Sequence, residues 1–258
     1  MTRTVLAEVH DGVATVTFNR ADGANALNMA MGRDLLEVAL RIEADPAVRA
    51  VVVTGAGKHF CFGGDLHGMA DQGAAIGGYL NELTTNIHAA ISCFVRMKAP
   101  VIAAVNGTAA GGGVGLMCMT DLAIAGRSSR FSLAYTGVGL APDCSTSFLL
   151  PRIVGRRRAL ELLLTNRTLS ADEALEWGLV NQVVDDAEVL PQALALAARF
   201  AAGPTESYAA VKRLVDAADP GLEAQMALEG RVIAAQALHP HGREGMAAFL
   251  GKRKPSFG

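Results

Sequence analysis

Two glycine-rich turns, each directly after a run of strand-forming residues, are the features of this sequence with the clearest chemical meaning. The first turn, Gly57–Leu66, follows Val51–Val53, and the second, Gly107–Gly115, follows Val101–Val105. If the two turns pack side by side, both can direct main-chain N–H groups at one point. Two such donors form an oxyanion hole, which stabilises the negative charge that develops on a carbonyl oxygen in a transition state.

The elements that must position these turns alternate between strands and helices. Residues 4–18 alternate in polarity around Asp11-Gly12, which predicts a β-hairpin. Apolar residues at helical spacing predict an amphipathic helix over 29–44. The same reasoning predicts strands at 49–54, 101–105, 121–125 and 130–133, and helices at 79–97 and from within Gly111–Gly113 to about Met119.

From Thr146 onward the pattern is mostly helical, with breaks near Gly155, Gly178, Gly203 and Pro220. A half with alternating strands and helices therefore precedes a helical half. This order is typical of an α/β fold with parallel strand pairing. We expect one α/β core with a helical C-terminal extension.

Composition narrows the class of protein. The chain has 258 residues, of which 51% are apolar and 19% charged, and its formal net charge is −2. Such a weak net charge favours neither nucleic acid nor a membrane surface as a partner. The four cysteines lack C-x-x-C or metal-ligand spacing, and neither a signal segment nor a membrane span is evident. We expect free thiols in a cytoplasmic protein without a metal ion.

Several well-known motifs are missing from the sequence. Gly55–Lys58 lacks the spacing and the Ser/Thr of a nucleotide-binding P-loop, and Gly111–Gly115 lacks the G-x-G-x-x-G spacing of a dinucleotide fold. Neither a G-x-S-x-G hydrolase elbow nor an H-E-x-x-H metal motif occurs.

The motifs that are present resemble those of the enoyl-CoA hydratase/isomerase (crotonase) superfamily over nearly the whole chain. The segment Phe60–Leu66 resembles the family's F-C-A-G-x-D-L motif, and Ala104–Gly113 resembles its A-V-N-G-x-A-x-G-G-G motif. Further matches are Asn19-Arg20, Asn25–Asn28, Leu150–Arg152, Leu169–Ala174, Trp177–Val180 and Phe249–Arg253.

This resemblance implies a crotonase (ClpP-like) α/β fold, in which ββα units form a spiral with a helical C-terminal extension. It implies a core domain at 1–200 that carries an acyl-CoA site, and a helical trimerisation region at 201–258. The expected partners are an acyl-CoA substrate and further copies of the chain, in a homotrimer or a hexamer. Coenzyme A enters as part of the thioester substrate, without a separate bound cofactor.

The resemblance also implies roles for particular residues. The N–H groups of Phe62 and Gly112 would hold the thioester oxygen, and Asp65 would order the first turn through local hydrogen bonds. Lys252 matches a family residue that contacts the phosphates of coenzyme A, often across a subunit boundary. The full set of predicted coenzyme A contacts is Asn25, Ala26, Leu27, Cys61, Gly64, Asp65, Leu66 and Lys252.

The predicted reaction depends on which acids are present. The two positions that carry glutamates in family hydratases are Gly115 and Tyr135 here, so simple hydration is not expected. Asp143 lies in Gly139–Cys144, which resembles the G-L-x-P-D-C turn of the 1,2-epoxyphenylacetyl-CoA isomerase type, where the aspartate is the single acid and base. A single carboxylate suits double-bond isomerisation of an enoyl-CoA. Alternatively, Asp143 caps the helix that follows it.

Two other functions remain open. The segment 152–169 resembles 4-chlorobenzoyl-CoA dehalogenases. In those enzymes the aspartate at the position of Asp143 is a nucleophile, and a histidine at the position of His88 assists hydrolysis. A tryptophan occupies the position of Tyr135. His88 is otherwise an ordinary helix residue, and Tyr135 either hydrogen-bonds Asp143 or fills the acyl pocket. The third function is that of an acyl-CoA-binding subunit without catalysis.

Overall fold

The main sheet of the protein has six strands, and it is parallel except for the N-terminal hairpin. The computed structural model describes residues 3–217, 235 and 239–257, so the helix break predicted near Pro220 lies outside the described residues. The strand order is β1-β2-β3-β5-β7-β10, in which only β1 and β2 pair antiparallel. The strands are β1 (Val5–His10), β2 (Val13–Phe18), β3 (Ala50–Gly55), β5 (Val101–Val105), β7 (Leu122–Gly126) and β10 (Gln182–Val184).

A second, four-stranded sheet contains the short strands that follow the main-sheet strands. Its order is β4-β6-β8-β9, and its members are β4 (His59–Cys61), β6 (Thr108–Ala110), β8 (Arg130–Ser132) and β9 (Thr168–Ser170). The chain therefore passes from the main sheet to the second sheet three times, in β3/β4, β5/β6 and β7/β8. This repeated unit is the predicted ββα spiral, and it places the two glycine turns beside one another.

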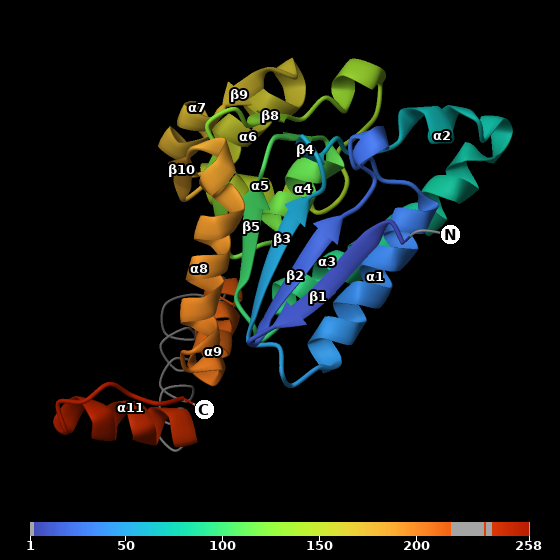
Figure 1. The fold of residues 1–258 in the computed structure, drawn as a ribbon. Helices are drawn as coiled ribbons and strands as arrows, with labels where there is room; N and C mark the ends of the chain where they lie inside the picture. The colour runs from blue at the N-terminus through green and yellow to red at the C-terminus, as the bar shows by residue number, and fades with distance from the viewer. Residues whose placement is uncertain (1–2, 218–234, 236–238, 258) are drawn as a thin grey trace.

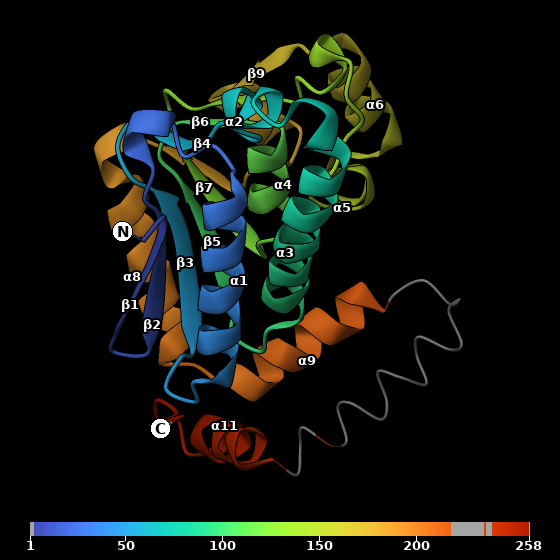
Figure 2. The ribbon, with the colours of Figure 1, turned by 90° about the vertical axis from the view of Figure 1, so that its right-hand side faces the viewer.

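Helices cover both faces of the main sheet, as Figure 2 shows. On one face, α1 (Met29–Ala44) packs against α3 (Ile76–Arg96), and on the other face lies α8 (Val189–Ala201). Successive strand residues point to opposite faces, so Val51 and Val53 join the core under α1 and α3 while Val52 joins the core under α8. Burial on both faces explains why β5 and residues 50–53 of β3 are apolar runs.

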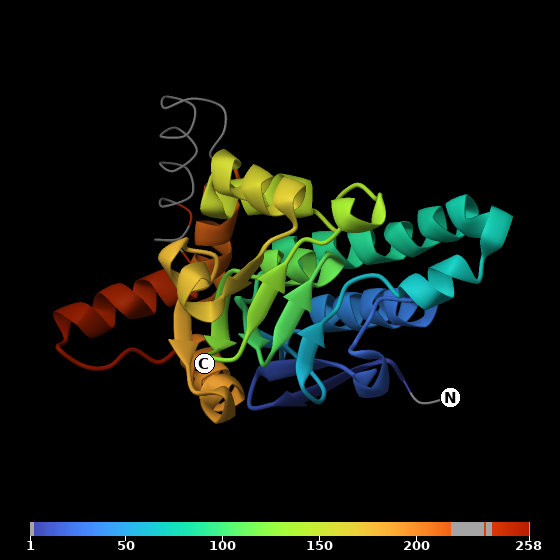
Figure 3. The same ribbon diagram turned by 90° about the horizontal axis from the view of Figure 1, so that it is seen from above.

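The C-terminal helices form an arm that leaves the core on the side opposite to α2 (Figures 1 and 3). The arm consists of α9 (Thr205–Asp216) and α11 (Pro240–Leu250). The remaining helices are α2 (Leu66–Ala70), α4 (Gly112–Cys118), α5 (Thr146–Val154), α6 (Arg156–Thr165) and α7 (Ala171–Glu176). Within the described part of the chain, every helix is too short or too polar to cross a membrane.

Most predicted elements are confirmed. The hairpin, the helix over 29–44 and the breaks at Gly155, Gly178 and Gly203 agree with the structure. The predicted glycine turns also contain strands β4 and β6, and the predicted helical half contains β9 and β10. Each of these four strands has three residues, which is too short for a periodic pattern to identify.

A capping box begins α7. The Ser170 hydroxyl accepts the Glu173 N–H, while the Glu173 carboxylate accepts the Ser170 N–H and binds Arg167 at 2.9 Å. The Ser170 N–H, then Arg167, lowers the pKa of Glu173 from 4.5 to about 2. The carboxylate therefore stabilises the folded state fully above pH 4.5, and this contribution is lost as the pH falls towards 2.

We expect Glu173→Gln to destabilise the protein at pH 6 and to have a much smaller effect near pH 2, because most of the carboxylate's contribution is lost once the pH reaches its folded-state pKa of about 2. The free energy of unfolding in urea, measured across this pH range, tests the prediction. Glu176→Gln, which removes an exposed carboxylate from the same helix, is the control. A stability difference between the wild type and Glu173→Gln that stays constant with pH would contradict it.

Candidate active site

Gly64 presents a free main-chain N–H at the first glycine turn. Leu27 forms a parallel bridge with Gly64, in which the Leu27 N–H donates to Gly63 O at 2.7 Å and the Asp65 N–H donates to Leu27 O at 2.9 Å. In such a bridge the N–H of the central residue faces away from the partner strand. Among the described residues no oxygen accepts the Gly64 N–H, and Gly64 lines a cavity.

The N–H of Phe62 is not available for an oxyanion, which corrects the prediction from the sequence. It donates to Ala24 O at 3.1 Å and so belongs to the framework of the turn. Gly63, between the two residues, has φ +80° and interrupts the regular alternation of an extended segment. Of the two amides, only that of Gly64 lacks an acceptor among the described residues, and Gly64 lines the cavity. The Phe62 ring borders the same cavity and packs edge-on against His59.

Gly112 supplies the second free N–H, as predicted. It is the first residue of α4, and the first N–H groups of a helix have no acceptor within the helix. The first glycine turn packs directly against it. Gly63 has φ +80°, and a Cβ there would lie 2.6 Å from Ala110 O and 3.0 Å from Gly112 N. The close approach of the two main chains therefore requires glycine at this position.

Both free amides border one largely apolar cavity of about 340 Å³, here called the front cavity. Asp143 contributes the single carboxylate among the described residues of its wall. A larger cavity of about 660 Å³, between the core and the arm, contains none of the predicted site residues. The apolar wall of the front cavity includes Phe62, Leu66, Met69, Leu80, Ala134, Val138, Leu140 and Ala141.

Tyr135 holds the Asp143 carboxylate in place. Its hydroxyl donates to Asp143 Oδ1 at 2.8 Å. Burial, followed by the nearby Cys144 and Asp143, raises the pKa of Tyr135, so the phenol remains a proton donor at neutral pH. The alternative in which Asp143 caps the next helix is wrong. Ser145 is the residue that precedes α5, and no side chain forms a cap hydrogen bond there.

The turn after Asp143 has an unusual backbone. Cys144 and Ser145 adopt φ values of 51° and 61°, which side-chain-bearing residues rarely adopt. This bend directs the Cys144 thiol against Gly112, whose Cβ, if present, would lie 3.0 Å from Sγ. Burial and then the Asp143 carboxylate raise the pKa of Cys144 well above its usual value, so the thiol is not an activated nucleophile.

His88 lies beside Asp143, although the two residues come from distant segments. The Cys144 N–H donates to His88 Nε2 at 3.3 Å, and side-chain donor atoms of His88, Asp143 and Cys144 lie within 4.8 Å of one another. His88 borders a second cavity of about 470 Å³, here called the rear cavity, whose wall also includes Asp143. The carboxylate thus separates the front cavity from the rear one.

Six of the eight predicted coenzyme A contacts divide into two groups. Gly64 and Leu66 line the front cavity, and Ala26 is partly exposed nearby. Leu27 is 2% exposed, while Asn25 and Cys61 are fully buried, so these three side chains support the site from beneath instead of facing a ligand. The Asn25 amide donates to Ala56 O at 3.0 Å and to His59 O at 2.8 Å.

Asp65 orders the first turn, as predicted. It accepts the Gly68 N–H at 3.1 Å and binds Arg20 at 3.0 Å. Burial opposes ionisation, but the Gly68 N–H and Arg20 outweigh it and lower the pKa of Asp65. Arg20, which also donates to Ala26 O, was missed as a support residue, because the match of Asn19-Arg20 to a family motif does not reveal its partner.

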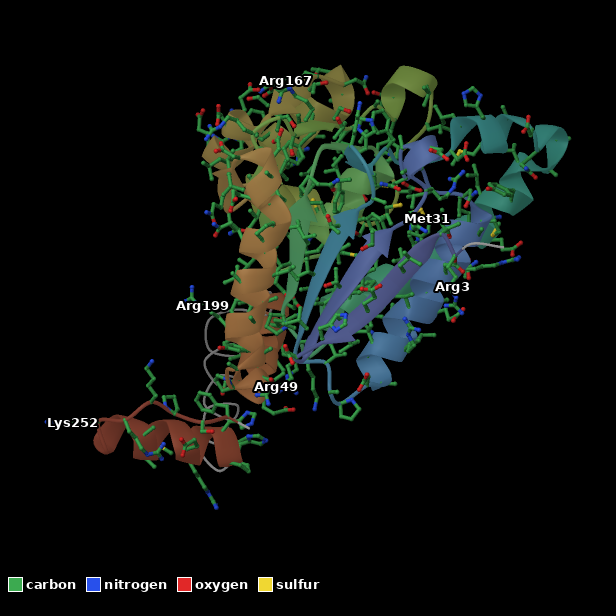
Figure 4. All side chains as sticks on the ribbon, viewed as in Figure 1. Arg3, Met31, Arg49, Arg167, Arg199 and Lys252 are labelled. Atoms are coloured by element: carbon green, nitrogen blue, oxygen red, sulfur yellow. The ribbon has the colours of Figure 1, made fainter. Side chains whose placement is uncertain are left out.

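Lys252 is exposed on the C-terminal arm, on the opposite side of the molecule from α2 (Figure 4). Within one chain it is therefore remote from the front cavity.

Comparisons with known proteins identify the family of the chain. The model of the enoyl-CoA hydratase/isomerase family matches residues 8–258. The chain is 38% identical to the 1,2-epoxyphenylacetyl-CoA isomerase of Escherichia coli K12, over 98% of this chain and 97% of that protein. It is 39% identical to 4-chlorobenzoyl coenzyme A dehalogenase-2 of an Arthrobacter species, over 98% and 92%.

Solved structures show the same fold. The crystal structure of an enoyl-CoA hydratase from Polaromonas sp. JS666 superposes with a TM-score of 0.93 at 32% identity, over 98% of both chains. The protein belongs to the enoyl-CoA hydratase/isomerase family, and it has the predicted crotonase fold.

We expect Gly63→Ala to separate the two glycine turns. The added methyl group must displace main-chain atoms, so the variant should lose about 1–3 kcal/mol of stability beyond the strain of its backbone. Displaced amides should also lower turnover about 100-fold. Urea unfolding and turnover of a CoA thioester measure the two effects.

Gly73→Ala is the matched control. Gly73 also has a positive φ of +50°, but a Cβ there would meet no atom within 4 Å. This variant should show only the backbone strain, about 1–2 kcal/mol, with unchanged turnover. Equal behaviour of the two alanine variants would show that the contact between the turns is unimportant.

Proposed function

We propose that the protein is an enoyl-CoA isomerase that shifts a carbon–carbon double bond with Asp143 as both acid and base. The observation that carries this proposal is one carboxylate on the wall of an apolar cavity that also holds the Gly64 and Gly112 amides. Asp143 would remove a proton from the carbon next to the thioester carbonyl of a 3-enoyl-CoA. The same carboxyl group would return the proton two carbons further along, giving the 2-enoyl-CoA.

The two amides would stabilise the intermediate between these proton transfers. Removal of the proton places negative charge on the thioester oxygen, and donors already in place cost no rearrangement when that charge appears. Tyr135 would keep the carboxylate directed at the substrate through its 2.8 Å hydrogen bond. The reaction needs no water, which suits the apolar wall of the front cavity.

The packing at Gly115 argues against a hydratase. A Cβ at Gly115 would lie 2.3 Å from Cys144 O and 2.8 Å from Cys144 Cβ. A glutamate at this position would therefore require the turn at 143–145 to move. Tyr135 occupies the second glutamate position, and its hydroxyl is committed to Asp143. The protein would thus lack both groups that hydration needs.

We also propose that copies of the chain assemble, as a trimer or a hexamer, and that Lys252 serves the site of a neighbouring copy. The support is the position of Lys252 on an arm that is remote from the front cavity of its own chain. Exposed apolar residues on the arm, namely Val211, Val215 and Met246, are consistent with a covered surface.

We expect Asp143→Asn to lower the conversion of a 3-enoyl-CoA to the 2-enoyl-CoA by about 100-fold or more, while substrate binding survives. Asparagine keeps the shape of the side chain and can still accept from Tyr135, so folding should be preserved. Mass spectrometry of the thioester, with deuterium uptake from solvent, measures the reaction. Asp172→Asn, on an exposed turn of α7, is the control. Unchanged turnover in Asp143→Asn would remove this residue from the mechanism.

One observation favours a second candidate, a dehalogenase of the 4-chlorobenzoyl-CoA type. A nitrogen of His88 lies within 4.8 Å of the Asp143 carboxylate, on the side of the rear cavity. The carboxylate would attack the ring carbon that bears chlorine, and chloride would leave with its bonding electrons. His88 would then take a proton from water, which would attack the carbonyl carbon of the resulting ester and release the hydroxylated ring.

This candidate predicts that His88→Gln treated with 4-chlorobenzoyl-CoA releases about one chloride per chain and retains an aryl ester on Asp143. Peptide mass spectrometry detects the ester, and chloride release is measured in parallel. His10→Gln changes an exposed histidine on β1 and should behave as wild type. Absence of chloride release from both wild type and variant would exclude dehalogenation.

A further inference from the structure

Three side chains with different metal-binding atoms lie close together at Asp143, which borders both cavities, with Cys144 buried behind it. Donor atoms of His88, Asp143 and Cys144 lie within 4.8 Å of one another. His88 belongs to α3, whereas Asp143 and Cys144 belong to the turn before α5, and the contact joins residues 56 positions apart in the chain. Within the described residues, no other group of three His, Cys, Asp or Glu side chains meets in this way.

The chemistry of these donors suits a zinc ion. An imidazole nitrogen, a thiolate sulfur and a carboxylate oxygen are the three ligand types that zinc takes in proteins, and three such ligands leave a fourth position open. In a tetrahedral site with bonds of about 2.0–2.3 Å, neighbouring donors are about 3.5 Å apart. A side-chain adjustment of His88, which is exposed, would bring the donors to that separation.

The surroundings orient the donors. The Tyr135 hydroxyl binds Asp143 Oδ1 and thereby fixes the carboxylate, as supporting hydrogen bonds do around metal ligands. His88 Nε2 accepts the Cys144 N–H at 3.3 Å, which places the ring beside the turn that carries the other two donors. This hydrogen bond must open before Nε2 binds an ion. The rear cavity of about 470 Å³ borders His88 and Asp143 and provides a path for the ion.

We propose that His88, Asp143 and Cys144 bind Zn²⁺ and that the bound ion inhibits the enzyme. Binding releases the thiol proton of Cys144 to solvent and forms a zinc–thiolate bond. The ion also takes up the Asp143 carboxylate, so that this group no longer accepts a substrate proton. The proposed metal binding does not depend on which reaction the protein catalyses, whereas the proposed inhibition rests on the role of Asp143 in isomerisation.

The test uses the full-length protein after treatment with a chelator. Co²⁺, a spectroscopic substitute for zinc, should bind one ion per chain and give the near-ultraviolet charge-transfer band of a cobalt–thiolate bond. Cys144→Ser should abolish this band, whereas Cys93→Ser, at a partly exposed cysteine elsewhere on α3, should retain it. Zn²⁺ titration calorimetry should show affinity at least about tenfold weaker in His88→Ala.

Inhibition is measured separately. Zn²⁺ should reduce isomerase turnover in proportion to occupancy of the site, and a chelator should restore it. A cobalt–thiolate band that persists in Cys144→Ser, or equal zinc affinity in wild type and His88→Ala, would overturn the proposal. His88 is exposed, so its alanine variant remains informative if Cys144→Ser fails to fold. If the band forms but Asp143→Asn keeps full isomerase activity, the proposed function fails while the metal site stands.

Discussion

The contact between two glycine-rich main chains is the constraint on which the site depends. The segment at Gly63 lies so close to Ala110 and Gly112 that a single added methyl carbon has no room. The Leu27–Gly64 bridge fixes one turn, and the beginning of α4 fixes the other. The fixed backbone keeps Gly64 and Gly112 on the wall of one cavity, and donors held in place in this way are the condition for electrostatic preorganisation.

The turn at 143–145 is the second unusual backbone feature, and it lies against the first. Two consecutive left-handed residues, Cys144 and Ser145, turn the chain so that the Asp143 carboxylate faces the cavities while the Cys144 thiol packs on Gly112. Backbone strain of this kind persists where the surrounding structure determines it and is frequent at functional sites. The same turn occupies the space that a side chain at position 115 would need. The backbone shape that presents the Asp143 carboxylate therefore also excludes a glutamate at position 115.

Local patterns in the sequence predicted much of the fold and part of the site. The hairpin, α1 and the helix beginning at Gly112 depend on neighbouring residues, and their patterns are visible in the sequence. The confusion of Phe62 with Gly64 has a different cause. Which of the two amides keeps a free N–H is decided by the contacts of Phe62 with Ala24 and of Gly64 with Leu27. These are long-range contacts that the spacing of residues does not encode. The approach of His88 to Asp143 was expected only through family resemblance, because it depends on the left-handed bend at Cys144.

Three residues spaced four apart on helix α3 line the two cavities. Leu80 and Thr84 line the front cavity, and His88, one turn further, lines the rear cavity. Since each helical residue rotates the side-chain direction by about 100°, inserting or deleting a single residue between Leu80 and His88 would remove the three side chains from a common face. Exchanges at the first two positions, in contrast, can reshape the front cavity without moving the histidine. The shape of the front cavity and the side chain beside Asp143 can therefore change independently of one another, provided that the length of this helix stays the same.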